Sequence, residues 1–255
     1  MIPTSESIVW AKTPRVVWGL IAVCIAVYAF EFTLSAADLK ALLEQYALVP
    51  RRYTHPGWAA EHGLSGLNPL PFLSSLFLHG GLFHILSNLW VLWIFGPPLE
   101  DRLGSGRFLA LYLASGLVAG FVHLLFNLGS DLPALGASGA IAGLIAGFAR
   151  RFPYAWVNVL QPVLFIPIFF MLPAMVFAGL WFAVQILHGT GAIFAPNVGG
   201  VAWFAHIGGF LAGWVLLRWL APPHDLAREQ GDAVQSALWP WTLWWRWWSW
   251  WWPKR

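Results

Sequence analysis

Ser138 and His206 are the residues whose types and positions point most directly to chemistry. Ser138 lies between glycines in GASGAIAG, residues 136–143, twelve residues before Arg150 in an apolar run. His206 precedes Arg218 by the same twelve residues in a second apolar run. A serine hydroxyl is a weak nucleophile until a base takes its proton, and neutral imidazole is the usual base. The sequence therefore predicts a Ser138–His206 dyad that attacks amide carbonyls.

A second pair, His84 and Asn88, could stabilise the negative charge that such an attack creates. The two residues are one helical turn apart in HILSN, so their side chains share a helix face. Attack on an amide produces an oxyanion, which needs hydrogen-bond donors. Because Ser138 would open a helix, its backbone N–H is free and lies at the positive end of the helix dipole. We therefore expect His84, Asn88 and the Ser138 N–H to form the oxyanion site.

The spacing to the basic residues places these groups inside a membrane. Twelve residues of helix span about 18 Å, whereas the hydrocarbon core of a bilayer is about 30 Å thick. With Arg150 at one interface, Ser138 would lie roughly 10 Å below the other face of the membrane. Backbone exposed to lipid at that depth is costly, so the segment before Ser138 must be buried in protein or line a wet cavity.

Composition supports a polytopic membrane protein. Of the 255 residues, 59% are hydrophobic and 10% are charged, compared with about 25% charged in soluble domains. The predicted fold is an all-α bundle with six transmembrane helices in residues 16–220, a long polar outer loop at 35–68 and Pro97-Pro98 ending the second span. The predicted spans are Val16–Leu34, His79–Gly96, Phe108–Leu128, Ser138–Arg150, Val159–Leu187 and Val201–Leu220.

Basic residues predict the orientation, because they concentrate on the cytoplasmic side of membrane proteins. A cytoplasmic amino terminus puts eleven of the fourteen Lys and Arg residues inside and leaves only Lys40, Arg51 and Arg52 outside. Residues 1–15 are then a cytoplasmic segment, and both termini are cytoplasmic. Residues 221–255 form a tail with nine of the nineteen tryptophans, which indicates an interfacial anchor in the lipid bilayer.

Several function classes are disfavoured. The net charge of +3 is too small for a nucleic-acid-binding surface. Cys24 is the single cysteine, so no intrachain disulfide forms, and the histidines lack the His-Glu-x-x-His spacing of a zinc protease. We predict no metal and no cofactor. The charged set Glu100, Asp101 and Arg102 is predicted to form a solvated turn.

Glycine spacing indicates which helices pack together. Gly139, Gly143 and Gly147 repeat every four residues, as do Gly209 and Gly213. Small residues at this spacing allow membrane helices to approach closely. Because Gly209 and Gly213 lie three and seven residues after His206, the imidazole would point along the same seam.

At these residues the chain resembles the rhomboid intramembrane serine proteases. GASG fits their Gly-x-Ser-Gly motif, AHIGGFLAG fits their sixth-span histidine motif, and HGGLFHILSN fits their second-span pattern. The resemblance implies cleavage of transmembrane protein substrates near their outer end, with lateral substrate access near the fifth span. It also implies the roles of individual residues: Ser138 as nucleophile, His206 as base, His84, Asn88 and the Ser138 N–H as oxyanion donors, and Gly136, Gly139, His79, Gly209 and Gly213 as supporting motif residues.

The chain departs from the family pattern at two places. Many members carry an aromatic residue four positions after the serine, stacked on the catalytic imidazole, where this chain has Ala142. The first loop has Arg51-Arg52 and a separate Trp58 in place of the Trp-Arg pair that members often have. Residues other than Ala142 must therefore orient His206.

Three alternatives stay open at this stage. A rhomboid-like pseudoprotease would bind membrane clients without cleavage but normally lacks the serine or the histidine. A transporter or channel would more often show paired acidic residues in its spans or inverted repeats. A metalloprotease would need zinc ligands. The six-span form favours a bacterial inner (plasma) membrane, and the sequence makes no prediction of the oligomeric state.

Overall fold

The structure is a computed structural model that describes residues 1–194 and 202–221. Residues 222–255, which hold most of the tail predicted to be an interfacial anchor, and Val201, the predicted start of the sixth span, lie outside the described residues. The described chain is mostly helical. Its helices and strands, in order, are β1 (Ile2–Glu6), α1 (Arg15–Thr33), α2 (Ala36–Tyr46), α3 (Pro50–Thr54), α4 (Pro56–Glu61), α5 (Leu70–Ser74), α6 (Leu82–Leu103), α7 (Ser105–Phe126), α8 (Ser138–Arg151), β2 (Trp156–Val163), β3 (Ile166–Pro173), α9 (Ala174–Phe194) and α10 (Trp203–Leu220).

Four of the described helices are long and apolar enough to cross a membrane, which makes the chain an integral membrane protein. They are Arg15–Thr33, Leu82–Leu103, Ser105–Phe126 and Ala174–Gly191. Helix α8 has 14 residues and is too short to cross a bilayer by itself. The count of six spans therefore stays a prediction.

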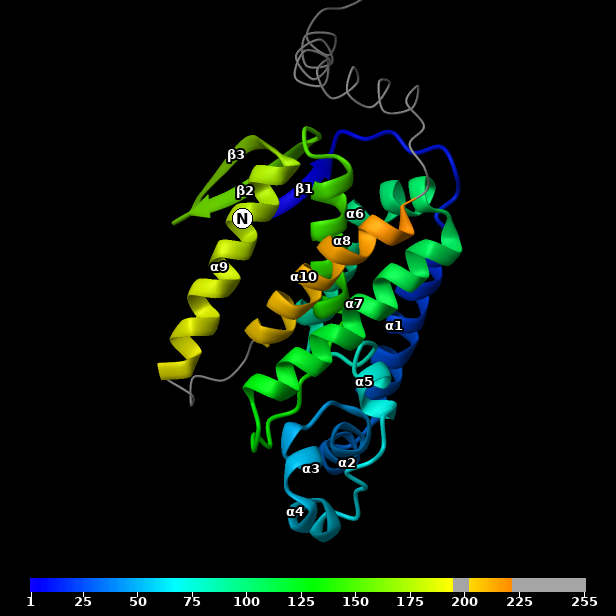
Figure 1. Ribbon diagram of the computed structural model, residues 1–255, viewed down its shortest axis with the longest axis vertical. Helices are drawn as coiled ribbons and strands as arrows, with labels where there is room; N and C mark the ends of the chain where they lie inside the picture. Colours follow the sequence, from blue (N-terminus) through cyan, green and yellow to red (C-terminus); the bar gives the residue numbers. More distant parts are fainter. Residues whose placement is uncertain (195–201, 222–255) are drawn as a thin grey trace, which may run out of the picture.

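Helix α8 is the centre of the molecule. All of its residues from Gly139 to Ala149 are buried, and it packs against α6, α7 and α10. Its sequence is rich in glycine and alanine, which have little side-chain volume, so backbones can come close to it from several sides. Figure 1 shows α8 between α6, α7 and α10, with the β-strands at one end of the helices and α2 to α4 at the other.

The prediction of an all-α fold is wrong in one region. Residues 2–6, 156–163 and 166–173 form a three-stranded antiparallel sheet in the order β1-β2-β3, so the fifth span begins at Ala174 and not at Val159. Prolines at 162, 167 and 173 disfavour a continuous helix here, since each lacks a backbone N–H and clashes with the preceding turn. Val157 and Val159 are buried on one face of β2, which is the alternation of a strand.

The second span also ends later than predicted. Helix α6 continues through Pro97 and Pro98 to Leu103, and Gly104 follows with a φ of 80°. Both prolines are buried, and packing inside the protein allows proline within membrane helices.

The charged residues that follow these prolines, among them Glu100 and Asp101, lie in the last turns of α6 and are buried, which contradicts the prediction of a solvated turn. The Glu100 carboxylate accepts hydrogen bonds from the backbone N–H groups of Val16 and Val17, at 3.0 Å each, and one from Ser105 Oγ at 2.7 Å. Asp101 accepts one from the Lys12 N–H at 3.1 Å. Glu100 therefore caps the first turn of α1, whose N–H groups have no partner within the helix.

The loop predicted to lie outside, residues 35–68, is organised around Arg52. Residues 35–68 include α2, α3 and α4, and the buried Arg52 guanidinium donates to the carbonyl oxygens of Gln45 and Ser65 at 2.9 Å each. Arg51 lies 3.8 Å from the Asp131 carboxylate, near the turn that leads to Ser138. These contacts show how the loop is held together without an adjacent Trp-Arg pair.

Candidate active site

Ser138 and His206 are in hydrogen-bond contact. Ser138 is the first residue of α8 and His206 lies near the start of α10, and the Ser138 Oγ is 2.9 Å from the His206 Nε2. The two residues are 68 positions apart in the sequence, so helix packing brings them together. A hydroxyl and an imidazole at this distance can exchange a proton, which is the first requirement for serine nucleophilic catalysis.

The glycine seam explains the short distance between α8 and α10. A Cβ atom added at Gly209 would overlap the carbonyl oxygen of Gly139, and one at Gly213 would overlap the carbonyl oxygen of Gly143. A Cβ at Gly139 would lie 2.6 Å from the Cβ of Ala119 on α7. The backbones of α8 and α10 are therefore so close that only glycine fits at these positions. His206 lies one helical turn before this glycine seam.

A third residue, Gln185 on α9, contacts the other nitrogen of the imidazole. Its Oε1 is 2.8 Å from the His206 Nδ1, and its Nε2 donates to the Trp181 carbonyl at 3.2 Å. Because the amide nitrogen is used by Trp181, the oxygen faces the ring and accepts from Nδ1–H. The His206 Nε2 is then the unprotonated nitrogen, which is the one that faces Ser138.

Sequence reasoning missed Gln185, although it identified the need for such a residue when it noted Ala142. The available signal was a single amide side chain in the mostly apolar stretch AMVFAGLWFAVQILHG, in which His188 is the other polar side chain. Intramembrane polar residues normally face the protein interior and are often functional. Trp181, one turn earlier on α9, also contacts the imidazole, with ring centroids 5.9 Å apart.

His84 and Asn88 lie beside the loop that leads into Ser138. Gly136 has a φ of 111°, and a Cβ at this position would lie 2.6 Å from the His84 Nε2 and 3.4 Å from the Asn88 Nδ2. A side chain is thus excluded at residue 136 by both conformation and space. The loop therefore passes directly over the two polar side chains, two residues before Ser138.

Both side chains have a donor available at this loop. The Asn88 Nδ2 is buried and has no hydrogen-bond partner among the residues that the structure describes. The His84 Nδ1 accepts the Gly80 N–H at 3.3 Å, so in the neutral ring the proton lies on Nε2, the nitrogen nearest Gly136. A buried donor without a partner is costly unless a ligand satisfies it, and an oxyanion would do so.

His79 lies behind His84 and does not reach Ser138 through any described contact. Its ring packs edge-on against that of His84 with centroids 5.3 Å apart, and its Nδ1 donates to the Phe77 carbonyl at 3.1 Å. Its backbone N–H lies 3.3 Å from the buried carboxylate of Glu31 on α1. These contacts fix the chain just before α6 and with it the place of His84.

The described residues thus bring a hydroxyl, an imidazole and two side-chain donors to the start of one buried helix. Within residues 1–194 and 202–221, no group of three or more His, Cys, Asp or Glu residues is arranged to hold a metal ion. The arrangement is suited to acyl transfer from an amide to serine.

The fold and these side chains define a helical membrane protein with a serine–histidine pair at the start of a buried helix. Comparison with known proteins shows its family. The family model for the Rhomboid domain matches residues 68–223, which is more than half of the chain. The protein therefore belongs to the rhomboid family, which confirms the resemblance seen in its motifs.

Individual relatives are similar over shorter stretches. The human presenilin-associated rhomboid-like protein, mitochondrial, is 35% identical over 101 residues, covering 39% of this chain and 26% of the relative. Rhomboid protein 1, mitochondrial, from Saccharomyces cerevisiae is 32% identical over 155 residues, covering 59% and 41%. Rhomboid protease GluP from Bacillus subtilis is 41% identical over 73 residues, covering 29% and 14%. The matched region is thus about a quarter of the length of the presenilin-associated relatives.

Proposed function

We propose that the protein is an intramembrane serine endopeptidase that hydrolyses peptide bonds in or near the transmembrane segments of membrane proteins. The observation that carries this proposal is the 2.9 Å contact between the Ser138 Oγ and the His206 Nε2 at the start of a buried helix. Membership in the rhomboid family and the name of the Bacillus subtilis relative, a rhomboid protease, support the same reaction.

The proposed reaction has two halves. In the first, His206 Nε2 takes the Ser138 proton while Oγ attacks the substrate carbonyl carbon, and the amine leaves with that proton as the acyl-enzyme forms. In the second, His206 takes a proton from water, the hydroxide attacks the ester, and Ser138 recovers its proton as the acid product leaves. His84, Asn88 and the Ser138 N–H donate to the oxyanion in both halves.

Gln185 is the positioning residue for His206 in this proposal. By accepting Nδ1–H, its oxygen fixes the ring orientation and the tautomer whose Nε2 can accept from Ser138. Its neutral amide stabilises the imidazolium formed during the reaction less than a carboxylate would. The proposed site is therefore a Ser-His dyad with an amide support, and the support comes from α9, a helix that carries neither member of the dyad.

The proposed orientation has the sheet on the cytoplasmic side, with both termini inside. Lys12, Arg102, Arg151 and Arg218 lie near the helix ends that Figure 1 shows at the sheet end of the molecule. Basic residues favour the cytoplasmic side. We propose a bacterial plasma membrane as the location. The matched relatives include mitochondrial proteins as well as a bacterial one, so fractionation of the source cell tests this point.

The test of function is cleavage of a single-span test substrate by the purified protein in liposomes. We expect cleavage by the unaltered protein and none by Ser138→Ala or His206→Ala. Thr190→Val is a matched control on α9, because the Thr190 side chain is exposed and its hydroxyl donates to the Ile186 and Leu187 carbonyls of its own helix. Full activity in either dyad variant would contradict the proposal. Substrate binding without cleavage by the unaltered protein would instead favour a client-binding pseudoprotease.

A further inference from the structure

The β2–β3 hairpin carries an apolar surface that plays no part in the proposed reaction. Residues 156–173 contain no Asp, Glu, Lys, Arg or His, and their only amide side chains are Asn158 and Gln161. The exposed fraction reaches 89% at Leu164 and 100% at Phe165, the tip of the hairpin. Antiparallel sheets in water usually place polar residues on their solvated face. Here the exposed residues of β3 are apolar, among them Ile166, Ile168 and Phe169.

The turn itself is unusual for a hairpin in water. Val163 pairs with Ile166, so Leu164 and Phe165 form a two-residue turn. Leu164 has a φ of 56°, a left-handed conformation that asparagine and glycine adopt most readily and that fits the turns of tight hairpins. The chain has two large apolar side chains at the place where water-exposed turns have Asn-Gly. This composition indicates that the tip meets an apolar environment.

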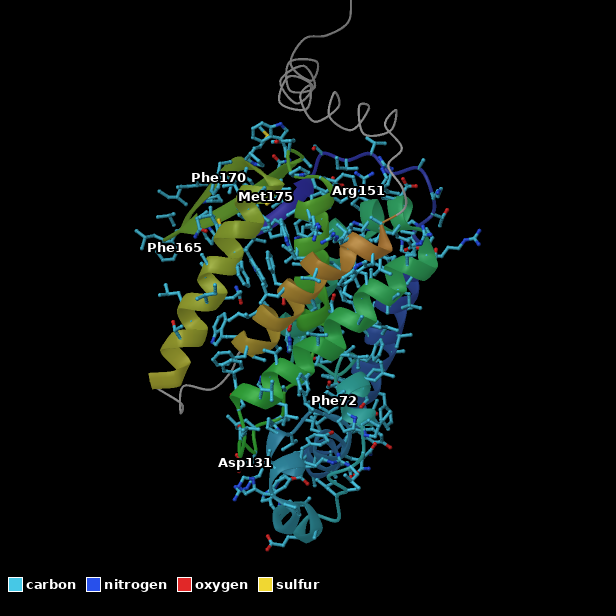
Figure 2. The ribbon with its side chains drawn as sticks, in the orientation of Figure 1. Phe72, Asp131, Arg151, Phe165, Phe170 and Met175 are labelled. Carbon is cyan, nitrogen blue, oxygen red and sulfur yellow. The ribbon has the colours of Figure 1, made fainter. Side chains whose placement is uncertain are left out.

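The position of the hairpin identifies that environment as lipid. Strand β3 ends at Pro173 and α9 begins at Ala174, so the hairpin leads directly into a helix suited to crossing the membrane. The exposed side of α9 continues the apolar surface through Met175, Val176 and Leu180. In Figure 1 the tip of the hairpin lies at the level of the first turns of α9 along the long axis, and Figure 2 shows Phe165 at the far end, pointing away from the helices.

We propose that the β2–β3 hairpin is a membrane-contacting element that lies in the interface of the leaflet on the sheet side, with Leu164 and Phe165 between lipid headgroups and acyl chains. This inference goes beyond the proposed function and does not depend on catalysis. Among residues 1–194 and 202–221, no further strand pairs with the outer edge of β3. This edge sets the depth, because backbone groups without a strand partner need water or headgroups and could not enter the hydrocarbon core. Pro167 on this strand removes one donor that would otherwise need a partner.

The experiment places a nitroxide spin label at the tip of the hairpin in the full chain in liposomes. Nineteen tryptophans would obscure a fluorescence measurement, whereas a spin label reports a single site. The one native cysteine, the buried Cys24, is replaced by alanine, and Phe165→Cys supplies the labelling site. Leu67→Cys is the matched control, because Leu67 is 93% exposed in the loop predicted to lie in water on the other side. For both labels we measure the collision rate with oxygen, which concentrates in lipid, and the collision rate with a water-soluble nickel chelate.

We expect the oxygen-to-nickel ratio at residue 165 to exceed that at residue 67 several-fold, with a mobile spectrum at both sites. Equal ratios at the two sites would place the tip in water and overturn the proposal. An immobilised label at residue 165 with low collision rates for both reagents would mean that protein covers the tip, whether a second copy or another part of this chain, and would also overturn it. Thermal unfolding of each labelled protein in detergent verifies that the fold is retained, and an unlabelled Cys24→Ala protein serves as its reference.

Discussion

At the scale of single residues, His206 has a polar partner on each ring nitrogen, and the two partners come from different helices. Ser138 on α8 lies at Nε2 and Gln185 on α9 at Nδ1, at 2.9 and 2.8 Å. An imidazole held at both nitrogens has one orientation and one tautomer. Ala142 lies where the resemblance led us to expect an aromatic residue on the imidazole, and Gln185 contacts the ring instead.

Substitution of Gln185 tests this positioning role. We expect Gln185→Leu to lower kcat roughly tenfold or more, because the imidazole ring loses its orientation. General acid–base catalysis contributes about 10²–10⁴-fold to a rate, and this loss would be a part of that contribution. Gln185→Glu should keep activity and move the acid limb of the pH–rate profile to higher pH, since a carboxylate stabilises the protonated imidazole and so removes the base at higher pH. The profile is measured from cleavage of a single-span substrate. A Gln185→Leu protein with unaltered kcat and profile would show that the contact has no positioning role.

Asn88 supplies the second prediction at this scale. Its buried Nδ2 has no partner in the described part of the chain and lies beside Gly136, so it is placed to donate to a charge that forms only during reaction. Asn88→Ala should therefore lower kcat with little change in KM, by about 2.7–4 kcal/mol of transition-state stabilisation. Steady-state kinetics in detergent measure both constants. An effect limited to KM would assign Asn88 to substrate binding instead.

At the scale of helices, the site depends on how closely α8 and α10 approach. Ser138 and His206 each lie one turn or less from glycines whose missing side chains allow the contact. Arg150 at the other end of α8 donates to the Trp214 carbonyl of α10, which fixes the same pair of helices near the opposite interface. The distance between the Ser138 hydroxyl and the His206 imidazole is therefore a property of the helix pair.

Gly213 is the position that tests this dependence without touching the site. A methyl group at residue 213 would overlap the Gly143 carbonyl, so Gly213→Ala should separate the helices, lower the thermal unfolding midpoint and reduce cleavage. Overpacking of this kind typically costs about 1–3 kcal/mol. Gly19→Ala is the matched control, because a Cβ at this position of α1 meets no atom within 4 Å. Equal unfolding midpoints and activities for the two variants would mean that the seam does not set the distance.

At the scale of the whole molecule, sequence reasoning was most successful where a motif and a helix period agreed. The bounds of α8 and α10 fall within two residues of the predicted spans, and the family is confirmed. The hairpin was missed because its residues are apolar enough to be read as a membrane span. In the sequence, its prolines are the signal against a helix. In the structure, the alternating burial of Val157 and Val159 identifies β2 as a strand.

Contacts between distant segments that no motif links could not be predicted. The strand β1 pairs with β2 across more than 150 residues, and Trp90 on α6 donates to the Pro3 carbonyl at 2.7 Å. Glu100 was expected in water because charged residues in a short turn are usually solvated, yet it caps α1. Gln185 reaches His206 only because α9 is placed beside α10. In each case the decisive partner lies on another element, about which local sequence carries no information.

The central claim is that Ser138 is a nucleophile activated by His206. Covalent labelling of the intact protein in liposomes by a fluorophosphonate probe tests it most directly, with the modified residue identified by mass spectrometry. The account predicts a single adduct on Ser138 that is lost in a folded His206→Ala protein. A folded, unaltered protein that stays unlabelled, or equal labelling with and without His206, would contradict it.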